Sequence, residues 1–475
     1  MVADKWRRSF VISFLVALAA ISGCAITVSI ILAHIGSSYV PFDRSGFAPL
    51  VFIHYRLPAA KVDLRGIAPA LLIWAVAFFA ILSVLRRRSN DRRVLAAILA
   101  SQAALLVIAL ASPVPLDSDQ YAYVGFGAAV ESHANPYHPA LLPSNASSVR
   151  ERVASHWGDP LVPDAYGPLF TLGDGLVLWP FRTMSLGLQA HVLRLLAALA
   201  ALVSSLLIAG TVRDARWRAV SVAAFALNPL VILETANGAH NDIFMVACVL
   251  GSAYLLSRNA FARSGFLLGC AIAIKFAYAP LIVPFAAYTY LRTRKAIGVL
   301  GAIVCVAAPI VLSAAPFGLR NSIVAPLATR RVDVLDHLPL FDRLGPHVSF
   351  GLLAAAIAAC ALLASVQILR DRLAASSAPL IALLLLTWLF ADKIEPWYAI
   401  VLTPVLLLAG YGGVATFAGV STAALIMLSG SFLDVYPTTL ALAVAVLLVL
   451  GLRYAVADRS GTSLMTTLRP SSLPS

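Results

Sequence analysis

The sequence predicts an all-α polytopic integral membrane protein, a helical bundle of about 12–14 transmembrane helices with long external loops. Hydrophobic residues make up 60% of the 475 residues, charged residues only 12%, and the mean hydropathy is +0.89. Soluble domains contain roughly 45–50% apolar residues, so water cannot be the main solvent of this chain. The apolar residues occur in runs of roughly 17–25 residues, the length that crosses a bilayer as a helix.

The apolar runs, separated by short polar breaks, predict the membrane spans. They are expected at about 9–33, 66–85, 94–112, 188–210, 219–235, 242–257, 296–315, 349–369, 375–391, 398–411, 413–431 and 436–452. Two segments fit this pattern poorly. The segment 264–291 contains Lys275, Pro280 and Pro284, which favours a hairpin of two half-length helices. The segment 167–186 is expected to be re-entrant or interfacial.

A net charge of +13 could indicate nucleic-acid binding, but the positive residues cluster beside the apolar runs. Clusters in that position orient membrane helices and contact anionic headgroups, so nucleic acid is not an expected partner. Placing clusters such as those at 5–8 and 86–93 in the cytoplasm puts most acidic residues and histidines at the outer surface. Titratable chemistry is therefore expected outside.

The chain divides into three predicted parts. Residues 1–93 form an N-terminal transmembrane hairpin, residues 94–410 a transmembrane core, and residues 411–475 the C-terminal helices with a cytoplasmic tail. The core contains the outer loop 113–166, which is far longer than the roughly 12–15 residues above which a loop is usually functional or disordered. Its aromatic residues favour order, so this loop is the candidate catalytic loop.

The outer loop begins with two carboxylates, Asp117 and Asp119, followed by Tyr121 and Tyr123. Carboxylates at a membrane boundary are costly unless they are solvated, paired or used, and tyrosines suit the interface. Together the four residues predict one polar site. The alternative is an acidic helix N-cap, in which a carboxylate accepts hydrogen bonds from free backbone N–H groups.

Two further motifs lie in the same loop. Asn135-Pro136-Tyr137 is typical of a turn, because proline restricts the backbone and asparagine bonds its neighbours. Tyr166-Gly167-Pro168 returns the chain to the membrane, with Tyr166 as an interfacial anchor. A loop corner and an architectural anchor are the simpler interpretations of these two motifs, and substrate binding is the alternative.

The short outer turn between the spans 219–235 and 242–257, together with the adjoining span ends, contains Glu234, His240, Asn241 and Asp242. These residues are expected at the depth of Asp119 and could share a cavity with it. The spacing of His240 and Asp242 does not match a pair of metal ligands on one helix face, and no third ligand is specified. No metal site is predicted, although the sequence leaves a divalent cation open.

Basic residues near the outer surface could bind a phosphate group. Arg330 and Arg331 are adjacent and offer forked donors, whereas Lys275 is expected deeper in the bundle. Headgroup contact is the alternative for the arginine pair. The turn at 392–398 adds Lys393 and Trp397 among other charged and aromatic residues, a high density for a simple connection.

The order of these motifs resembles the C-type, multi-spanning glycosyltransferases, especially the bacterial polyprenyl-phosphomannose-dependent mannosyltransferases. The resemblance covers roughly residues 100–410. It rests on Asp119-Gln120-Tyr121-Ala122-Tyr123, Asn135-Pro136-Tyr137, Tyr166-Gly167-Pro168-Leu169-Phe170, Asn228-Pro229-Leu230 with Gly238-Ala239-His240-Asn241-Asp242, Lys275 and Pro396-Trp397-Tyr398.

The resemblance implies an enzyme of the bacterial inner (plasma) membrane with its active site facing the periplasm or exterior. Such an enzyme moves a single sugar, here mannose, from a polyprenyl-phosphate donor to a lipid or glycan acceptor with inversion. The acidic catalytic residue of the first large outer loop corresponds to Asp119, with Asp117 second.

The residue chemistry agrees with that implication. Breaking a sugar–phosphate bond builds positive charge at the anomeric carbon, and a carboxylate that accepts the proton of the acceptor hydroxyl assists attack. Arginine and lysine would stabilise the leaving phosphate. The rival predictions are a transporter or flippase, since Lys275 and proline-broken helices also mark substrate pathways, and a polymerase or ligase of lipid-linked glycans.

Overall fold

The computed structural model describes residues 2–39, 67–86, 92–112, 119–137, 163–324, 346–371, 376–388, 396–408 and most of 413–424. Every regular element in these residues is helical. Six helices in this part of the chain are long and apolar enough to cross a membrane, or seven if one bent pair is a single span. The predicted polytopic helical fold is confirmed.

The helices belong to two compact units, each built from discontinuous segments. The first comprises Met1–Ala122, Phe181–His240 and Tyr411–Asp458, and the second comprises Tyr123–Pro180, Asn241–Gly410 and Arg459–Ser475. The division falls inside α4 (Asp119–Glu131), whose first turn belongs to the first unit. The three predicted parts, 1–93, 94–410 and 411–475, stay a prediction.

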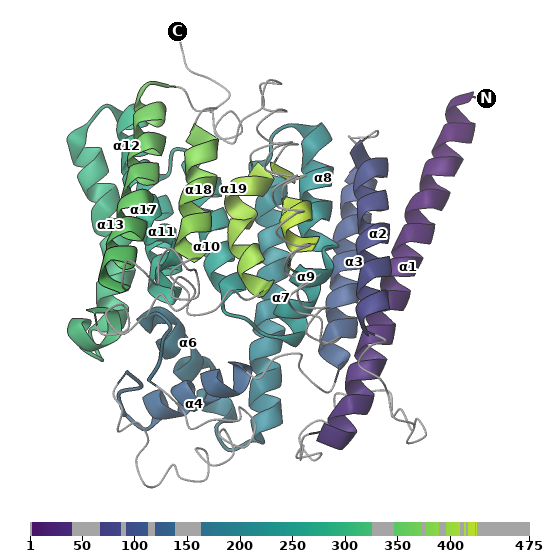
Figure 1. Cartoon of the computed structure of the whole chain (residues 1–475), viewed down its shortest axis with the longest axis horizontal. Helices are drawn as coiled ribbons and strands as arrows, with labels where there is room; N and C mark the ends of the chain where they lie inside the picture. The colour runs from purple at the N-terminus through teal and green to yellow at the C-terminus, as the bar shows by residue number, and fades with distance from the viewer. Residues whose placement is uncertain are drawn as a thin grey trace. The chain divides into compact units, whose positions relative to one another are not determined.

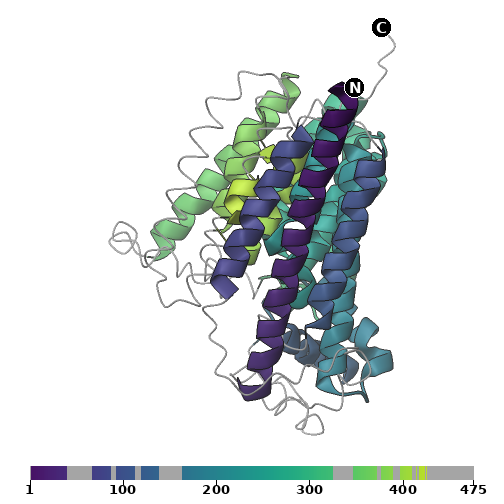
Figure 2. The ribbon, with the colours of Figure 1, turned by 90° about the vertical axis from the view of Figure 1, so that its right-hand side faces the viewer.

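In the first unit, α1 (Val2–Tyr39) runs alongside α2 (Ile67–Arg86) and α3 (Arg92–Ala111), as Figure 2 shows. α7 (Leu186–Thr211) packs on α3 and on α8 (Ala215–Ala226). Buried polar side chains tie this bundle together: the indole of Trp74 donates to the carbonyl of Leu227, and the amide of Gln102 donates to that of Ala201.

The first unit contains a sharp helix break at Asn228 and Pro229. α8 ends before the break, and the segment that follows, α9 (Pro229–Ile232) with η4 (Leu233–Asn237), is bent by 50° from α8. Proline at the first helical position needs no N–H partner, and the Asn228 side chain accepts from the N–H of Leu230 at 3.0 Å. The same amide donates to Ser421 at 2.7 Å. The break thereby directs η4 away from the axis of α8.

In the second unit, α10 (Asp242–Leu256) packs on α11 (Phe261–Ile274), and α12 (Ile282–Thr293) packs on α13 (Ala296–Ala314) and α17 (Pro346–Leu369), as Figure 1 shows. α18 (Ser377–Trp388), η8 (Pro396–Leu402) and α19 (Thr403–Leu408) also belong to this unit. The short helix α6 (Pro168–Leu178) contacts α11 and α13.

Two glycines bring α11 and α13 into close contact. A Cβ at Gly265 would lie 2.4 Å from the carbonyl oxygen of Ala302, and one at Gly269 would lie 2.1 Å from that of Val306. The residue numbers increase along both helices from the first contact to the second, so α11 and α13 run parallel. Small residues four positions apart are the usual means of such an approach between membrane helices.

The predicted hairpin of half-length helices at 264–291 is present as α11 and α12, which are joined by η5 (Phe276–Leu281). α12 returns to the start of α13 after a two-residue turn, so it runs opposite to α11. The ambiguous segment 167–186 contains α6, whose 11 residues are too few to cross the hydrocarbon layer.

The remaining predicted spans have mixed outcomes. α2, α3, α7 and α13 match their predicted ranges within a few residues, whereas α10 and the helix at 398–408 are shorter than a full span. The prediction at 436–452 lies outside the described residues. The total of about 12–14 spans stays a prediction.

Candidate functional site

Three of the predicted site residues gather in the first unit. His240 lies with its Nε2 3.1 Å from Glu234 Oε2 and its Nδ1 3.9 Å from Asp119 Oδ2. The side chains of His240 and Glu234 are 1% and 2% exposed, whereas that of Asp119 is 23% exposed. Asp119 is therefore the carboxylate of this cluster that a substrate can reach.

The backbone of the turn after η4 places the imidazole of His240. η4 is a π-helix, and Ala239, after it, has a φ of 56°, in the left-handed region that non-glycine residues rarely adopt. A Cβ at Gly238 would lie 2.8 Å from the imidazole Cδ2 of His240. Any larger residue at position 238 would push the ring away. Strained backbone and π-helical turns are frequent at functional sites.

The sequence analysis missed Arg194, which lies 1% exposed in the middle of α7. Its guanidinium donates from Nε to the carbonyl of Ala236 at 2.9 Å, from Nη1 to that of Ser112 at 3.0 Å and from Nη2 to that of Ala109 at 2.8 Å. One side chain thus connects the end of α3 with η4. The sequence contained one signal that could have identified Arg194, namely a single arginine within a long apolar helix.

Tyr121, in the first turn of α4, is 3% exposed. Burial raises the pKa of its hydroxyl to about 12, although the nearby charge of Arg194 acts in the opposite direction. The phenol therefore stays neutral at physiological pH. Because side chains two positions apart on a helix point to different faces, the Tyr121 phenol and the Asp119 carboxylate leave α4 in different directions.

A second cluster lies in the second unit. Lys275 Nζ donates to both carboxylate oxygens of Asp242, and it lies 4.5 Å from the centre of the Tyr398 ring. Lys275 is the extended residue that ends α11, and Asp242 occupies the first turn of α10. A carboxylate there is stabilised by the helix dipole. Both side chains are buried.

Asn241 directly precedes Asp242, the acidic partner of this ion pair, and its side chain is buried, with 1% of the residue exposed. Within the described part of the chain, neither its amide nitrogen nor its amide oxygen has a hydrogen-bond partner. Buried polar side chains are nearly always hydrogen-bonded, so an open amide calls for a partner such as a bound water or a ligand. Asn241 is therefore a candidate binding group.

The motifs around Tyr137 and Tyr166 form one hydrogen-bonded loop core. The Tyr137 hydroxyl donates to the carbonyl of Tyr166 at 3.1 Å and lies 3.0 Å from Thr171 Oγ1. Thr171 Oγ1 in turn donates to Asp164 Oδ2, and the N–H of Tyr166 donates to Asp164 Oδ1 at 2.8 Å. Asn135 closes the turn by accepting from the N–H of Tyr137 at 3.0 Å.

Burial controls the ionisation of this core. It raises the pKa of Asp164 to about 7, although the hydrogen bonds from Thr171 and Tyr166 act in the opposite direction. It also raises the pKa of Tyr137 and that of Asp174, a further buried carboxyl, which lies on α6. Sequence analysis missed Asp164 and Asp174, whose apolar surroundings arise only in the folded chain.

Gly167 joins the loop core to the lysine site. Its N–H donates to the carbonyl of Ile274 at 2.8 Å, directly before Lys275. A Cβ at Gly167 would lie 2.2 Å from the carbonyl oxygen of Ala273, so only glycine allows this approach. Tyr123 packs edge-on against Tyr166, with ring centres 5.1 Å apart. These contacts connect motifs that are widely separated in the sequence.

Several predicted site residues lie outside the described part of the structure. They are Asp117, Arg330, Arg331, Lys393 and the side chain of Trp397. Among the described residues, no group of three or more His, Cys, Asp or Glu side chains could hold a metal ion.

Comparison with known proteins decides the family. The family model described as "Alpha-(1->6)-mannopyranosyltransferase, N-terminal domain" matches residues 20–292 of the 475. The chain belongs to this family. It is therefore a glycosyltransferase, and its apolar helices make it a membrane mannosyltransferase. The matched region of the mannosyltransferase includes Asp119, His240, Asp242 and Lys275, whereas Tyr398 lies beyond it.

No curated protein and no solved structure matches this mannosyltransferase significantly. The family match confirms the resemblance to bacterial α-mannosyltransferases on which the sequence analysis relied.

Proposed function

We propose that this protein transfers a single mannose from a polyprenyl-phosphate carrier to a lipid or glycan acceptor on the outer membrane face, with inversion at the anomeric carbon. The single observation that supports the catalytic assignment is the position of Asp119 beside His240, with Glu234 on the other side of the imidazole. Enzymes often activate a hydroxyl with a base that is oriented by a second side chain, which is in turn held by a third. Here the three would be Asp119, His240 and Glu234.

In the proposed reaction, the carboxylate of Asp119 accepts the proton of the acceptor hydroxyl. The hydroxyl oxygen forms a bond to the anomeric carbon from the face opposite the phosphate. The bond between that carbon and the phosphate oxygen breaks, and the phosphate leaves with the electron pair. The exposure of Asp119 supports this role, because buried Glu234 cannot meet an acceptor without rearrangement.

His240 is proposed as a positioning residue, and Asp117 as the secondary carboxylate. For the leaving phosphate we propose cationic contacts from Arg330, Arg331 and Lys393. Lys275 is also a candidate, although its charge is already balanced by Asp242. Donors aimed at developing charge are usually the largest contribution to such catalysis.

The test of the donor uses purified full-length protein in detergent or nanodiscs. We expect transfer from polyprenyl-phosphate mannose to an α-mannoside without any nucleotide, because the proposed site lies across the membrane from cytoplasmic nucleotide pools. Mass spectrometry of the product should show one added hexose. Turnover with a nucleotide sugar in the absence of lipid carrier would contradict the proposal, and addition of a preassembled chain would indicate a polymerase or ligase.

A separate experiment tests which side of the membrane the 113–166 loop faces. A single cysteine at Ser144, introduced after replacement of the native cysteines, should react with an impermeant thiol reagent in intact spheroplasts. A cysteine at Arg213, which follows α7 and belongs to an expected cytoplasmic cluster, should react only after lysis. The reverse pattern would place the 113–166 loop in the cytoplasm.

A further inference from the structure

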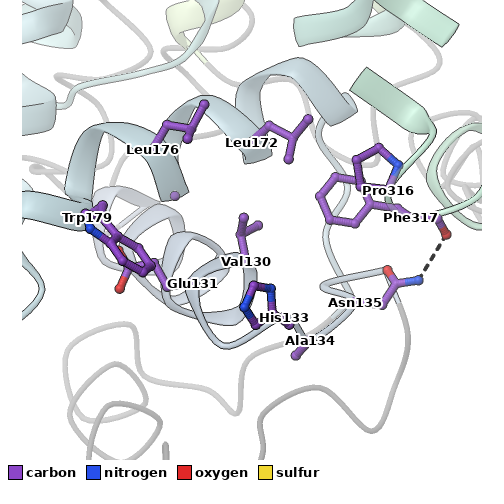
Figure 3. A pocket seen from close by; sticks show the side chains of 11 residues that line it. Val130, Glu131, His133, Ala134, Asn135, Leu172, Leu176, Trp179, Pro316 and Phe317 are labelled. Carbon is purple, nitrogen blue, oxygen red and sulfur yellow. Dashed lines mark hydrogen bonds between the residues drawn. The ribbon is translucent and has the colours of Figure 1, made fainter. Parts of the chain in front are cut away.

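The second unit contains a cavity of about 410 Å³ that is lined by residues of α4 and α6 and of the turns beside them. This volume lies within the range of roughly 300–1,000 Å³ that is usual for small-molecule sites. Figure 3 shows the side chains that surround it. They come from the end of α4 and the turn after it, from α6 and the following residues, and from the turn at Pro316 and Phe317.

The cavity has two chemically different sides. Glu131, His133 and Asn135 line one side, and Leu172 and Phe317 face them from the other, as Figure 3 shows. A carboxylate, an imidazole and an amide supply both donors and acceptors. His133 has a φ of 55°, a left-handed conformation that residues other than glycine rarely adopt and that is often retained at functional positions.

Trp179 adds a large aromatic wall. It lies directly after α6 and remains 51% exposed, although an indole of this size is usually buried. An exposed indole beside several polar groups suits a ligand that has an apolar face and hydroxyls at its edge. A pyranose ring has this form, because its axial C–H bonds can cover the indole while its hydroxyls bond to the polar side.

The cavity is connected to the residues around Lys275 by the hydrogen bonds of the second unit. The Asn135 amide donates to the carbonyl of Phe317 at 3.1 Å, so both walls are held together. Asn135 also orders Tyr137, whose hydroxyl bonds to Tyr166, the neighbour of Gly167. A ligand in the cavity would therefore contact the loop that packs beside Lys275.

We propose that this cavity binds a sugar ring of the acceptor glycan, with the ring on Trp179 and its hydroxyls on Glu131, His133 and Asn135. The inference rests on the proposed function and deepens it, since it identifies the acceptor as a carbohydrate and gives it a binding site. It predicts that an acceptor long enough to fill the cavity is used better than a single sugar.

The test compares Trp179→Ala with the wild-type protein, using polyprenyl-phosphate mannose as donor and α-1,6-linked mannotriose or methyl α-mannoside as acceptor. We expect the KM for mannotriose to rise about tenfold in Trp179→Ala, with kcat and the donor KM nearly unchanged, because uniform binding is lost. Trp179→Phe retains an aromatic face and should lie between the two. Glu131→Gln should also raise the acceptor KM.

Direct binding gives a second measurement. Saturation-transfer NMR with mannotriose should show ring protons in contact with wild-type protein and a weaker effect in Trp179→Ala. The matched control is Leu312→Ala, which removes an exposed apolar side chain of α13 outside the cavity and should change neither measurement. Thermal unfolding of each variant in the same detergent verifies that it is folded.

The outcomes separate the two proposals. An unchanged acceptor KM and unchanged NMR contact in folded Trp179→Ala protein would overturn the acceptor cavity while leaving the transfer reaction intact. A rise in the donor KM alone would assign the cavity to the lipid carrier and would also overturn it. Wild-type protein that binds mannotriose but never transfers mannose would contradict the proposed function and leave the binding site in place.

Discussion

The ammonium group of Lys275 lies 2.9 Å from Oδ1 and 3.1 Å from Oδ2 of Asp242, so that one cation contacts both oxygens of a buried carboxylate. The two residues lie 33 positions apart in the sequence. One ends α11 and the other begins α10, so the ion pair holds the tip of the α11–α12 hairpin against the start of α10.

Removing one partner of this pair should destabilise the protein strongly. In Lys275→Ala the carboxylate of Asp242 remains buried without its cation, which typically costs about 3–5 kcal/mol. We therefore expect a clearly lower unfolding temperature for the purified variant in detergent. The double variant Lys275→Met with Asp242→Leu replaces both charges by apolar groups and should recover most of the loss. A Lys275→Ala protein as stable as the wild type would show that the pair contributes little.

The second prediction concerns Asp119. Asp119→Asn keeps the size and most hydrogen bonds of the side chain but removes the proton acceptor, so turnover should fall by roughly 10²–10⁴-fold. Folding should survive, because asparagine has nearly the shape of aspartate and the side chain at this position is 23% exposed. The measurement is the initial rate of mannose transfer from the lipid-linked donor.

Asp117→Asn is the paired control and should be milder. A nearly normal rate in folded Asp119→Asn together with an inactive Asp117→Asn would move the base to Asp117. Activity in both variants would remove this pair from the mechanism and leave Asp119 as an acidic residue in the first turn of α4.

A third prediction uses two glycines of the same region. Gly167→Ala would place a methyl group about 2.2 Å from the carbonyl oxygen of Ala273, so the loop or α11 must move. Such overpacking typically costs about 1–3 kcal/mol. Gly173→Ala, in α6, adds a methyl group that meets nothing within 4 Å. It should be neutral or slightly stabilising, because alanine favours helix over glycine by roughly 0.5–1 kcal/mol. Equal unfolding temperatures for both variants would contradict the close approach.

The fourth prediction follows from the buried carboxyl of Asp164. Its pKa is raised to about 7, so the folded protein binds this proton more tightly than the unfolded chain, whose carboxyl titrates near roughly 3.9. The associated stability is therefore complete below about pH 4 and is lost as the pH rises to about 7. Asp164→Asn does not titrate, so its unfolding temperature relative to the wild type should increase between about pH 5 and about pH 8. Parallel pH profiles would exclude this contribution.

The sequence alone determined the fold class, the approximate position of several spans and the family. Apolar run length is a local property, so the predicted spans 66–85 and 188–210 agree closely with α2 (Ile67–Arg86) and α7 (Leu186–Thr211). Lys275 and the nearby prolines likewise indicated the interrupted hairpin, because a break in helical hydrogen bonding depends on a few adjacent residues.

Only the tertiary structure decided which polar residues meet. It paired Lys275 with Asp242, placed His240 beside Asp119, and showed that Arg194 bonds to four backbone carbonyls from two separate segments. It also buried Asp164 and thereby raised its pKa. These relationships depend on how helices pack side by side. Helix packing is set by shape and by the need to satisfy buried polar groups across many residues, which no single stretch of sequence records.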